Sequence, residues 1–216
     1  MANGSGINKN KLEIALNIII VLFTAVGTAL MLFGGTESGS LSAQGIANLK
    51  FYTVLSNLLC GVVALIHLIL LLTGRSAAKL VPYKLAGVCG VTITFAVVAF
   101  FFGPLYGWPQ FYRGGNLYFH LLEPVAAMIE FLVIKRDRIP FRHTVIAAVP
   151  TLIYGFGYLG NILINGIGGP WPDTNDFYGF VNWGYPMGLL IFACITLLSF
   201  GVACIYRKAS NSRVEA

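Results

Sequence analysis

The sequence predicts an all-helical integral membrane protein, a bundle of six transmembrane helices with both termini in the cytoplasm. Three observations predict this fold class. The 216 residues are 57% hydrophobic and only 10% charged, whereas soluble domains carry about 25% charged residues. Six apolar stretches are long enough to cross a bilayer, which takes about 20 helical residues. The basic residues fall on alternate connections between these stretches.

The predicted spans occupy most of the chain, so we expect residues 1–216 to form a single transmembrane domain. In chain order they cover residues 14–33, 51–72, 85–102, 117–134, 144–164 and 183–206. The first span follows Lys9 and Lys11 and resembles a signal peptide in this respect. Its apolar run exceeds the roughly 7–15 residues of a signal-peptide core, and no small-residue cleavage site follows promptly. We therefore expect this span to be retained.

The distribution of basic residues predicts the orientation of the chain. Twelve of the fourteen Lys and Arg residues lie before span one, between spans two and three, between spans four and five, or after span six. Only Lys50 and Arg113 lie on the other side. The positive-inside rule then places both termini in the cytoplasm, and we expect the protein in the plasma (inner) membrane. The net charge of +6 thus reflects orientation and does not indicate a nucleic-acid partner.

Thr53 and His120 are the clearest candidates for chemistry. Thr53 lies near the start of span two and His120 near the start of span four, and both spans run inward from the outer face. At 1.5 Å per residue, both lie roughly 5 Å below the outer boundary. Lateral packing of the two spans would bring them together. An ionisable group at membrane depth is costly unless it faces a cavity or the bundle interior, so His120 suggests a functional site.

More polar residues gather in the outer halves of the spans. Each polar group without a hydrogen-bond partner in lipid costs about 2–7 kcal/mol. An outward-facing pocket that admits an amphiphile would satisfy them. The candidate substrate-binding residues of this pocket are Ser56, Asn57, Glu123, Asn161, Asn182 and Trp183.

Thr53 and His120 together suggest acyl-ester hydrolysis. A threonine hydroxyl is a weak nucleophile that needs a neighbouring base, and a neutral imidazole suits that role. Thr53 would attack the ester and His120 would take its proton, while Asn57, Ser56 or an indole N–H would donate to the oxyanion. A structural alternative stays open, in which the Thr53 hydroxyl only bonds the carbonyl one turn earlier in its helix.

A deeper set of ionisable residues consists of Glu123, Glu130 and His67. The two glutamates are two turns apart on one face of span four, and His67 on span two lies near the depth of Glu130. They form either a proton relay or a buried ion pair that fixes the helix register. We favour the structural role because no other residue of the inner layer has reactive chemistry.

The sequence predicts neither a metal nor another cofactor. A catalytic zinc needs three protein ligands, but His67, His120 and His143 lie at different depths. The chain also contains no HExxH motif.

Three short motifs stand at the start of span two, in span four and before span six. They are residues 50–57 (KFYTVLSN), 120–124 (HLLEP) and 178–182 (YGFVN). These motifs resemble those of the androgen-induced and androgen-dependent TFPI-regulating membrane protein family, and especially its bacterial six-span relatives of unassigned function. The resemblance covers most of the chain through the six-span layout. It implies that Thr53 and His120 match the threonine and histidine with which eukaryotic members hydrolyse fatty acid esters of hydroxy fatty acids.

The chain departs from the bacterial relatives at two places. They often carry an acidic residue followed by Trp where this chain has Glu130 and Phe131, and a Pro-Phe-Leu-Asp stretch where it has residues 179–182. The second difference removes a carboxylate near the pocket. We thus expect an intramembrane hydrolase whose partners are the bilayer and a lipid or fatty-acyl ester. The alternative is a non-enzymatic protein that binds lipid or translocates a small solute or protons. The oligomeric state stays open.

Overall fold

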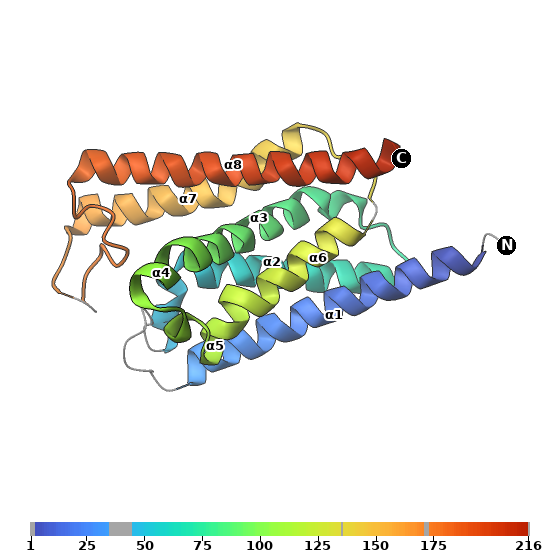
Figure 1. Ribbon diagram of the computed structural model, residues 1–216, viewed down its shortest axis with the longest axis horizontal. Coiled ribbons are helices and arrows are strands. Elements are labelled where there is room, and N and C mark those ends of the chain that lie inside the picture. The colour runs from blue at the N-terminus through green and yellow to red at the C-terminus, as the bar shows by residue number, and fades with distance from the viewer. Residues whose placement is uncertain (1–2, 35–44, 135, 171–172, 216) are drawn as a thin grey trace.

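The protein is described by a computed structural model for residues 3–34, 45–134, 136–170 and 173–215. Within these ranges it is helical and has no β-strand beyond an isolated bridge between Gly168 and Thr174. Figure 1 shows long helices side by side, with the two ends of the chain at the same end of the bundle. Lys135, one of the basic residues of the orientation pattern, lies outside the described residues.

The six predicted spans are confirmed as helices that are long and apolar enough to cross a membrane. They are Asn10–Phe33, Tyr52–Leu72, Ala78–Tyr106, Gly114–Val133, Arg142–Asn165 and Tyr185–Val214. The third span begins well before the predicted residue 85. The prediction treated Lys84 as part of a connection because it is charged, but this lysine is buried inside the helix and ion-paired.

Four spans are continuous helices and two contain π-helical turns. The continuous ones are α1 (Asn3–Phe33), α2 (Tyr52–Leu72), α7 (Arg142–Asn165) and α8 (Tyr185–Glu215). Span three joins η2 (Ala78–Leu80), α3 (Val81–Val97), the π-turn η3 (Val98–Phe102) and α4 (Gly103–Tyr106). Span four joins α5 (Gly114–Leu117), the π-turn η5 (Tyr118–Leu122) and α6 (Glu123–Val133). Two short 3-10 helices, η1 (Gly45–Lys50) and η4 (Trp108–Phe111), precede α2 and follow α4.

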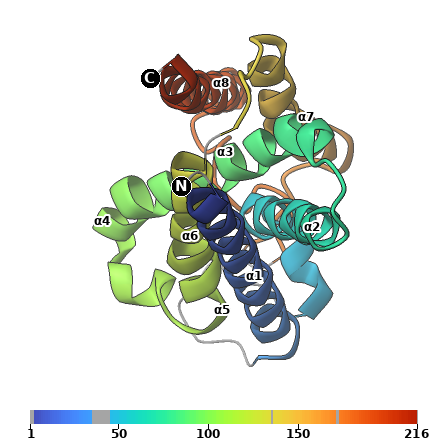
Figure 2. The same cartoon turned by 90° about the vertical axis from the view of Figure 1, so that its right-hand side faces the viewer.

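The α3 helix is the centre of the bundle. It contacts α2, α6, α7 and α8, and Figure 2 shows it among these helices. Two glycines let α2 approach it closely. A Cβ on Gly87 would lie 3.1 Å from the Cα of Cys60, and one on Gly90 would lie 3.0 Å from the Cβ of Ser56. Small residues at a contact allow two membrane helices to pack backbone to backbone.

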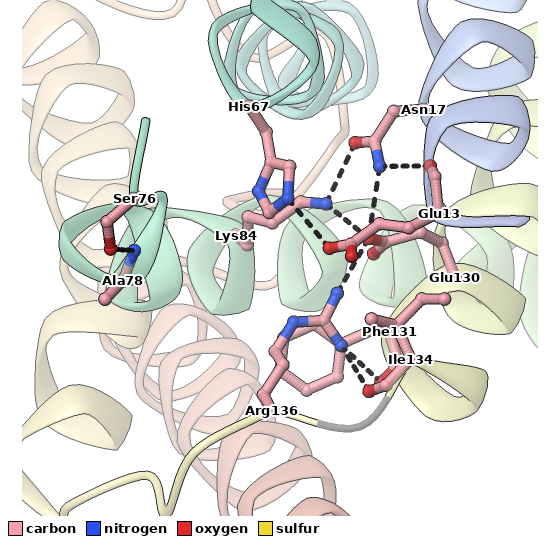
Figure 3. Close-up of polar contacts among 10 residues, drawn as sticks. All are labelled: Glu13, Asn17, His67, Ser76, Ala78, Lys84, Glu130, Phe131, Ile134 and Arg136. Atoms are coloured by element: carbon pink, nitrogen blue, oxygen red, sulfur yellow. Dashed lines mark hydrogen bonds and ion pairs between the residues drawn. The ribbon is translucent and has the colours of Figure 1, made fainter. Parts of the chain in front are cut away.

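Charged side chains cluster in the half of the bundle nearest the chain ends (Figure 3). The Oε1 atom of Glu130 accepts from Lys84 Nζ at 2.5 Å and from Arg136 Nη2 at 2.7 Å. His67 Nε2 lies 2.8 Å from Glu13 Oε1. The glutamate partner of His67 is therefore Glu13 on α1 and not Glu130. Glu130 does form a buried ion pair, but its partners are Lys84 and Arg136, which the sequence analysis did not place with it.

Candidate active site

A cavity of about 100 Å³, or about 940 Å³ when the space open to solvent is counted, lies at the end of the bundle where α2 begins. Its walls come from α1, η1, α2, span three, η4, span four, α7, α8 and the loop before α8. Hydrophobic and aromatic side chains make up most of its surface. The polar lining residues are Asn48, Tyr52, Thr53, Thr94, Asn116, His120, Thr151, Tyr154 and Tyr178.

Thr53 lies in the first turn of α2 and lines this cavity. The helix starts there because Phe51 is extended, and because the Tyr52 N–H donates to the Tyr178 hydroxyl at 2.9 Å. Among the described residues, the Thr53 hydroxyl has no hydrogen-bond partner. The structural alternative, a bond from this hydroxyl to the carbonyl one turn earlier, is therefore not found. The hydroxyl is available to a molecule in the cavity.

His120 lines the same cavity from span four and is only 7% exposed. Its Nδ1 lies 2.9 Å from the carbonyl oxygen of Phe111. A carbonyl can only accept, so Nδ1 carries the proton and a neutral His120 has Nε2 as its basic nitrogen. The Phe111 ring meets the imidazole edge to face, with centroids 6.0 Å apart. These contacts fix the tautomer and orientation that a general base requires.

A π-turn places His120. In η5 the Glu123 N–H bonds the carbonyl of Tyr118, five residues earlier, instead of the carbonyl of Phe119. The next residue, Pro124, has no N–H to donate. The Phe119 carbonyl therefore loses its usual backbone donor, and the Asn57 side-chain amide donates to it instead at 3.1 Å. The same amide donates to the Thr53 carbonyl at 2.7 Å. Asn57 thus ties together the backbones next to Thr53 and His120.

The predicted packing of spans two and four is present, since α2 contacts both η5 and α6. Thr53 and His120 share one cavity as a result. No hydrogen bond joins their side chains in the described residues. Catalytic hydrogen bonds are often long in an unliganded enzyme and shorten when the substrate binds. The structure therefore places Thr53 and His120 in the wall of one cavity, without a hydrogen bond between their side chains.

Three of the predicted substrate-binding residues are buried below the cavity and do not line it. The Ser56 hydroxyl pairs with that of Thr94 at 3.1 Å. Both Nδ2 hydrogens of Asn57 are engaged by backbone carbonyls. Glu123 is 0% exposed and neither of its carboxylate oxygens has a hydrogen-bond partner. These three residues therefore pack behind the cavity wall. Neither Ser56 nor Asn57 has a hydrogen left to donate to an oxyanion.

The other three predicted substrate-binding residues lie outside the cavity lining. Asn161 on α7 donates to Asn175 Oδ1 at 3.1 Å and so holds the loop before α8. Asn182 is exposed, and Trp183 is 71% exposed. Span six begins at Tyr185, so Asn182 and Trp183 lie in the turn before α8 and not on a helix that faces the cavity.

The cavity has polar residues that the sequence analysis did not single out. Asn116 lies one turn before His120, and its amide has no partner among the described residues. The i, i+4 spacing was the signal that could have identified it. Tyr178 comes from the loop, and burial raises its pKa to about 12. It therefore stays protonated at neutral pH and can donate a hydrogen bond as well as accept one.

Metal ligands do not gather in this site. In the part of the chain that the structure describes, no group of three or more His, Cys, Asp and Glu side chains lies together. The candidate chemistry is therefore that of an hydroxyl, an imidazole and neutral donors.

No protein-family model, curated protein or solved structure matches the chain.

Proposed function

We propose that the protein is an intramembrane hydrolase of lipid or fatty-acyl esters, with Thr53 as nucleophile and His120 as general base. The observation that carries this proposal is the shared cavity, in which an unpartnered Thr53 hydroxyl accompanies an imidazole whose Nδ1 is held by the Phe111 carbonyl. The basic Nε2 atom is then the nitrogen left for proton transfer. The resemblance of residues 50–57 and 120–124 to the threonine hydrolase family supports the same assignment.

The reaction proceeds through an acyl-threonine. As the Thr53 Oγ1 atom attacks the ester carbonyl carbon, His120 Nε2 takes the hydroxyl proton. The tetrahedral intermediate collapses and breaks the bond to the alcohol oxygen, which leaves with the proton from His120. A water molecule, deprotonated by His120, then attacks the acyl carbon and releases the acid and free Thr53. Asn116, whose amide lines the cavity, is the candidate donor to the oxyanion.

The cavity suits a substrate with an acyl chain. Ligand pockets are mostly apolar clefts or cavities, and hydrophobic side chains make up most of the surface of this cavity. The apolar part of the wall, which includes Val97, Phe102 and Ile195, would contact the acyl chain of the substrate. The polar residues of α2 and span four would contact the ester.

A covalent probe for activated hydroxyls tests the proposal. A lipid-like fluorophosphonate should label the native protein, and Thr53→Ala should abolish the labelling. His120→Ala should slow it by about 10²–10⁴-fold, the usual contribution of a general base. Thr94→Ala is the matched control, because Thr94 lines the same cavity but is bonded to Ser56. Labelling that persists in Thr53→Ala and maps to another residue would rule out Thr53 as the nucleophile.

A non-enzymatic role is the second candidate, and one observation favours it. The Thr53 and His120 side chains are not hydrogen-bonded, so the cavity would also serve as a simple lipid-binding site. A translocation path past Glu130 is less favoured, because the ion pairs with Lys84 and Arg136 occupy that level. Retention of a bound lipid by a Thr53→Ala variant, together with no ester turnover by the native protein, would favour this role.

A further inference from the structure

Glu123 differs from the other buried carboxylates of the described residues. Glu130 has two cationic partners. Asp176 accepts from the Tyr158 hydroxyl at 2.5 Å and from the backbone N–H of Phe180 and Val181. Glu123 is equally buried, but both of its oxygens lack a partner. A carboxylate in this state is costly in a membrane protein unless something compensates its charge.

The side chain of Asn57 also has a buried oxygen without a hydrogen-bond partner. Its side chain is 0% exposed, and its Oδ1 atom has no hydrogen-bond partner. The orientation of the amide follows from its neighbours, because the Thr53 and Phe119 carbonyls both accept from Nδ2. Turning the amide over would set its oxygen against two carbonyls. The Oδ1 atom is therefore a fixed, unused acceptor inside the protein.

These atoms lie where α1, α2 and span four meet. The Thr24 hydroxyl on α1 lies beside the Glu123 carboxyl, but it donates its only hydrogen to the Ile20 carbonyl at 2.9 Å and so leaves the carboxylate without a donor. Thr24 also packs against Gly61, one turn after Asn57. One turn further along α1, the Thr28 hydroxyl is also buried without a partner. All three helices thus contribute side-chain oxygens at the same level of the bundle.

The backbone at this level also has a carbonyl without its usual donor. Pro124 has no N–H to donate to the carbonyl of His120, and the Glu123 N–H donates to the carbonyl of Tyr118. This irregular turn lies directly next to Glu123, so a backbone oxygen adds to the side-chain oxygens at this level.

We propose that Glu123 and Asn57 form a buried site for a monovalent cation, Na⁺, between α1, α2 and span four. Hard cations take oxygen ligands, and the unpartnered atoms of Glu123 and Asn57 are all oxygens. One carboxylate balances one positive charge. A proton shared between Glu123 and Asn57 Oδ1 would leave the second carboxylate oxygen of Glu123 without a partner, whereas a cation can bind all three oxygens. The site is separate from the Thr53 hydroxyl, so its test does not depend on hydrolysis.

Thermal unfolding and ion binding test the site. The purified full chain, in lipid nanodiscs at neutral pH and fixed ionic strength, is melted while NaCl replaces choline chloride. A ligand that binds only the folded state raises the melting temperature with its concentration. We expect this rise in Na⁺, together with saturable binding of ²²Na⁺ at about one ion per chain. Glu123→Gln should abolish both responses, and Asn57→Ser should weaken the ²²Na⁺ affinity at least about tenfold, roughly 1.4 kcal/mol.

Asn161→Ala is the matched control, since Asn161 is an amide outside the site, and it should keep the full Na⁺ response. If Glu123→Gln fails to fold, ²²Na⁺ binding and its competition by unlabelled NaCl in the native protein decide the question. The proposal is overturned by a native melting temperature that is equal in the two salts, or by a Na⁺ response that survives in Glu123→Gln. A melting temperature that depends on pH alone would instead identify Glu123 as a protonated acid, with His120 and Cys60 as its titratable neighbours.

Discussion

Replacing Glu130 by Gln should destabilise the bundle more than any other single change in the cluster of Glu130, Lys84 and Arg136. The Oε1 atom of Glu130 accepts from Lys84 at 2.5 Å and from Arg136 at 2.7 Å, and both cationic side chains are 6% exposed. Removing one partner of a buried pair costs about 3–5 kcal/mol, because it leaves an uncompensated charge. Glu130→Gln leaves two buried cations facing each other. We expect a loss of unfolding free energy at the upper end of this range, about 5 kcal/mol.

The matched variant is Lys84→Met, which removes one cation and leaves Glu130 paired with Arg136. The guanidinium of Arg136 also donates to the carbonyls of Phe131 and Ile134, at 2.8 and 3.1 Å, so it stays in place. We expect this change to cost only about 1–3 kcal/mol, the cost of a lost hydrogen bond to a charged group. The double variant should be less destabilised than the sum of its parts, since contacting residues couple by about 0.5–3 kcal/mol.

Equilibrium unfolding in mixed micelles, followed by tryptophan fluorescence, measures these differences. The order of the two single variants is the decisive result. If Lys84→Met costs as much as Glu130→Gln, or if the double variant is simply additive, Glu130 is not the shared anion of the cluster and the reasoning fails.

Three further predictions concern other parts of the molecule. Burial raises the pKa of Tyr178 from 10.0 to about 12. As the pH rises, the unfolded chain therefore loses the Tyr178 proton before the folded protein does. The free energy of unfolding should then fall by up to about 2.7 kcal/mol between pH 10 and 12. Tyr178→Phe should flatten that part of the stability profile, and an unchanged profile would refute the assignment. Gly61→Ala should cost about 1–3 kcal/mol because its Cβ would overlap Thr24, whereas Gly157→Ala, with open space around it, should be neutral in the same denaturation assay. Asn57→Ala should cost about 1–3 kcal/mol and slow probe labelling, because the buried Phe119 carbonyl loses its donor; native labelling kinetics would contradict this role.

The spans and the depth of the candidate pair were predictable from the sequence. Hydropathy identifies membrane helices because lipid allows no other backbone arrangement for such a chain. Depth follows from counting residues at a constant rise, so Thr53 and His120 could be placed at one level. The contact between α2 and span four confirmed the packing that the prediction needed. Lys84 was misplaced because a charge inside a helix is read as a helix boundary unless its partner is known.

The direction in which each side chain points around its helix axis was much harder to predict. Successive residues of a helix turn by about 100°, so equal depth says nothing about which residues share a face. Asn161 on α7 has a suitable depth but lies outside the cavity lining. Asn182 and Trp183 were missed for another reason, because they lie in the turn before α8 and not on a helix. The neighbours of a helix decide which face is inside, and those neighbours become known only with the fold.

The π-turn of span four shows how a local signal could have narrowed this uncertainty. A π-turn adds one residue to the helix, which rotates everything after it relative to what precedes it. Pro124 lies inside an apolar run, where a missing N–H must leave a carbonyl without a donor. In lipid that carbonyl requires a polar side chain from a neighbouring span, and Asn57 supplies it. A proline within a membrane span, matched by an amide at similar depth in another span, thus predicts both a helix irregularity and a helix contact. In this protein the irregularity holds His120 and the contact holds Thr53.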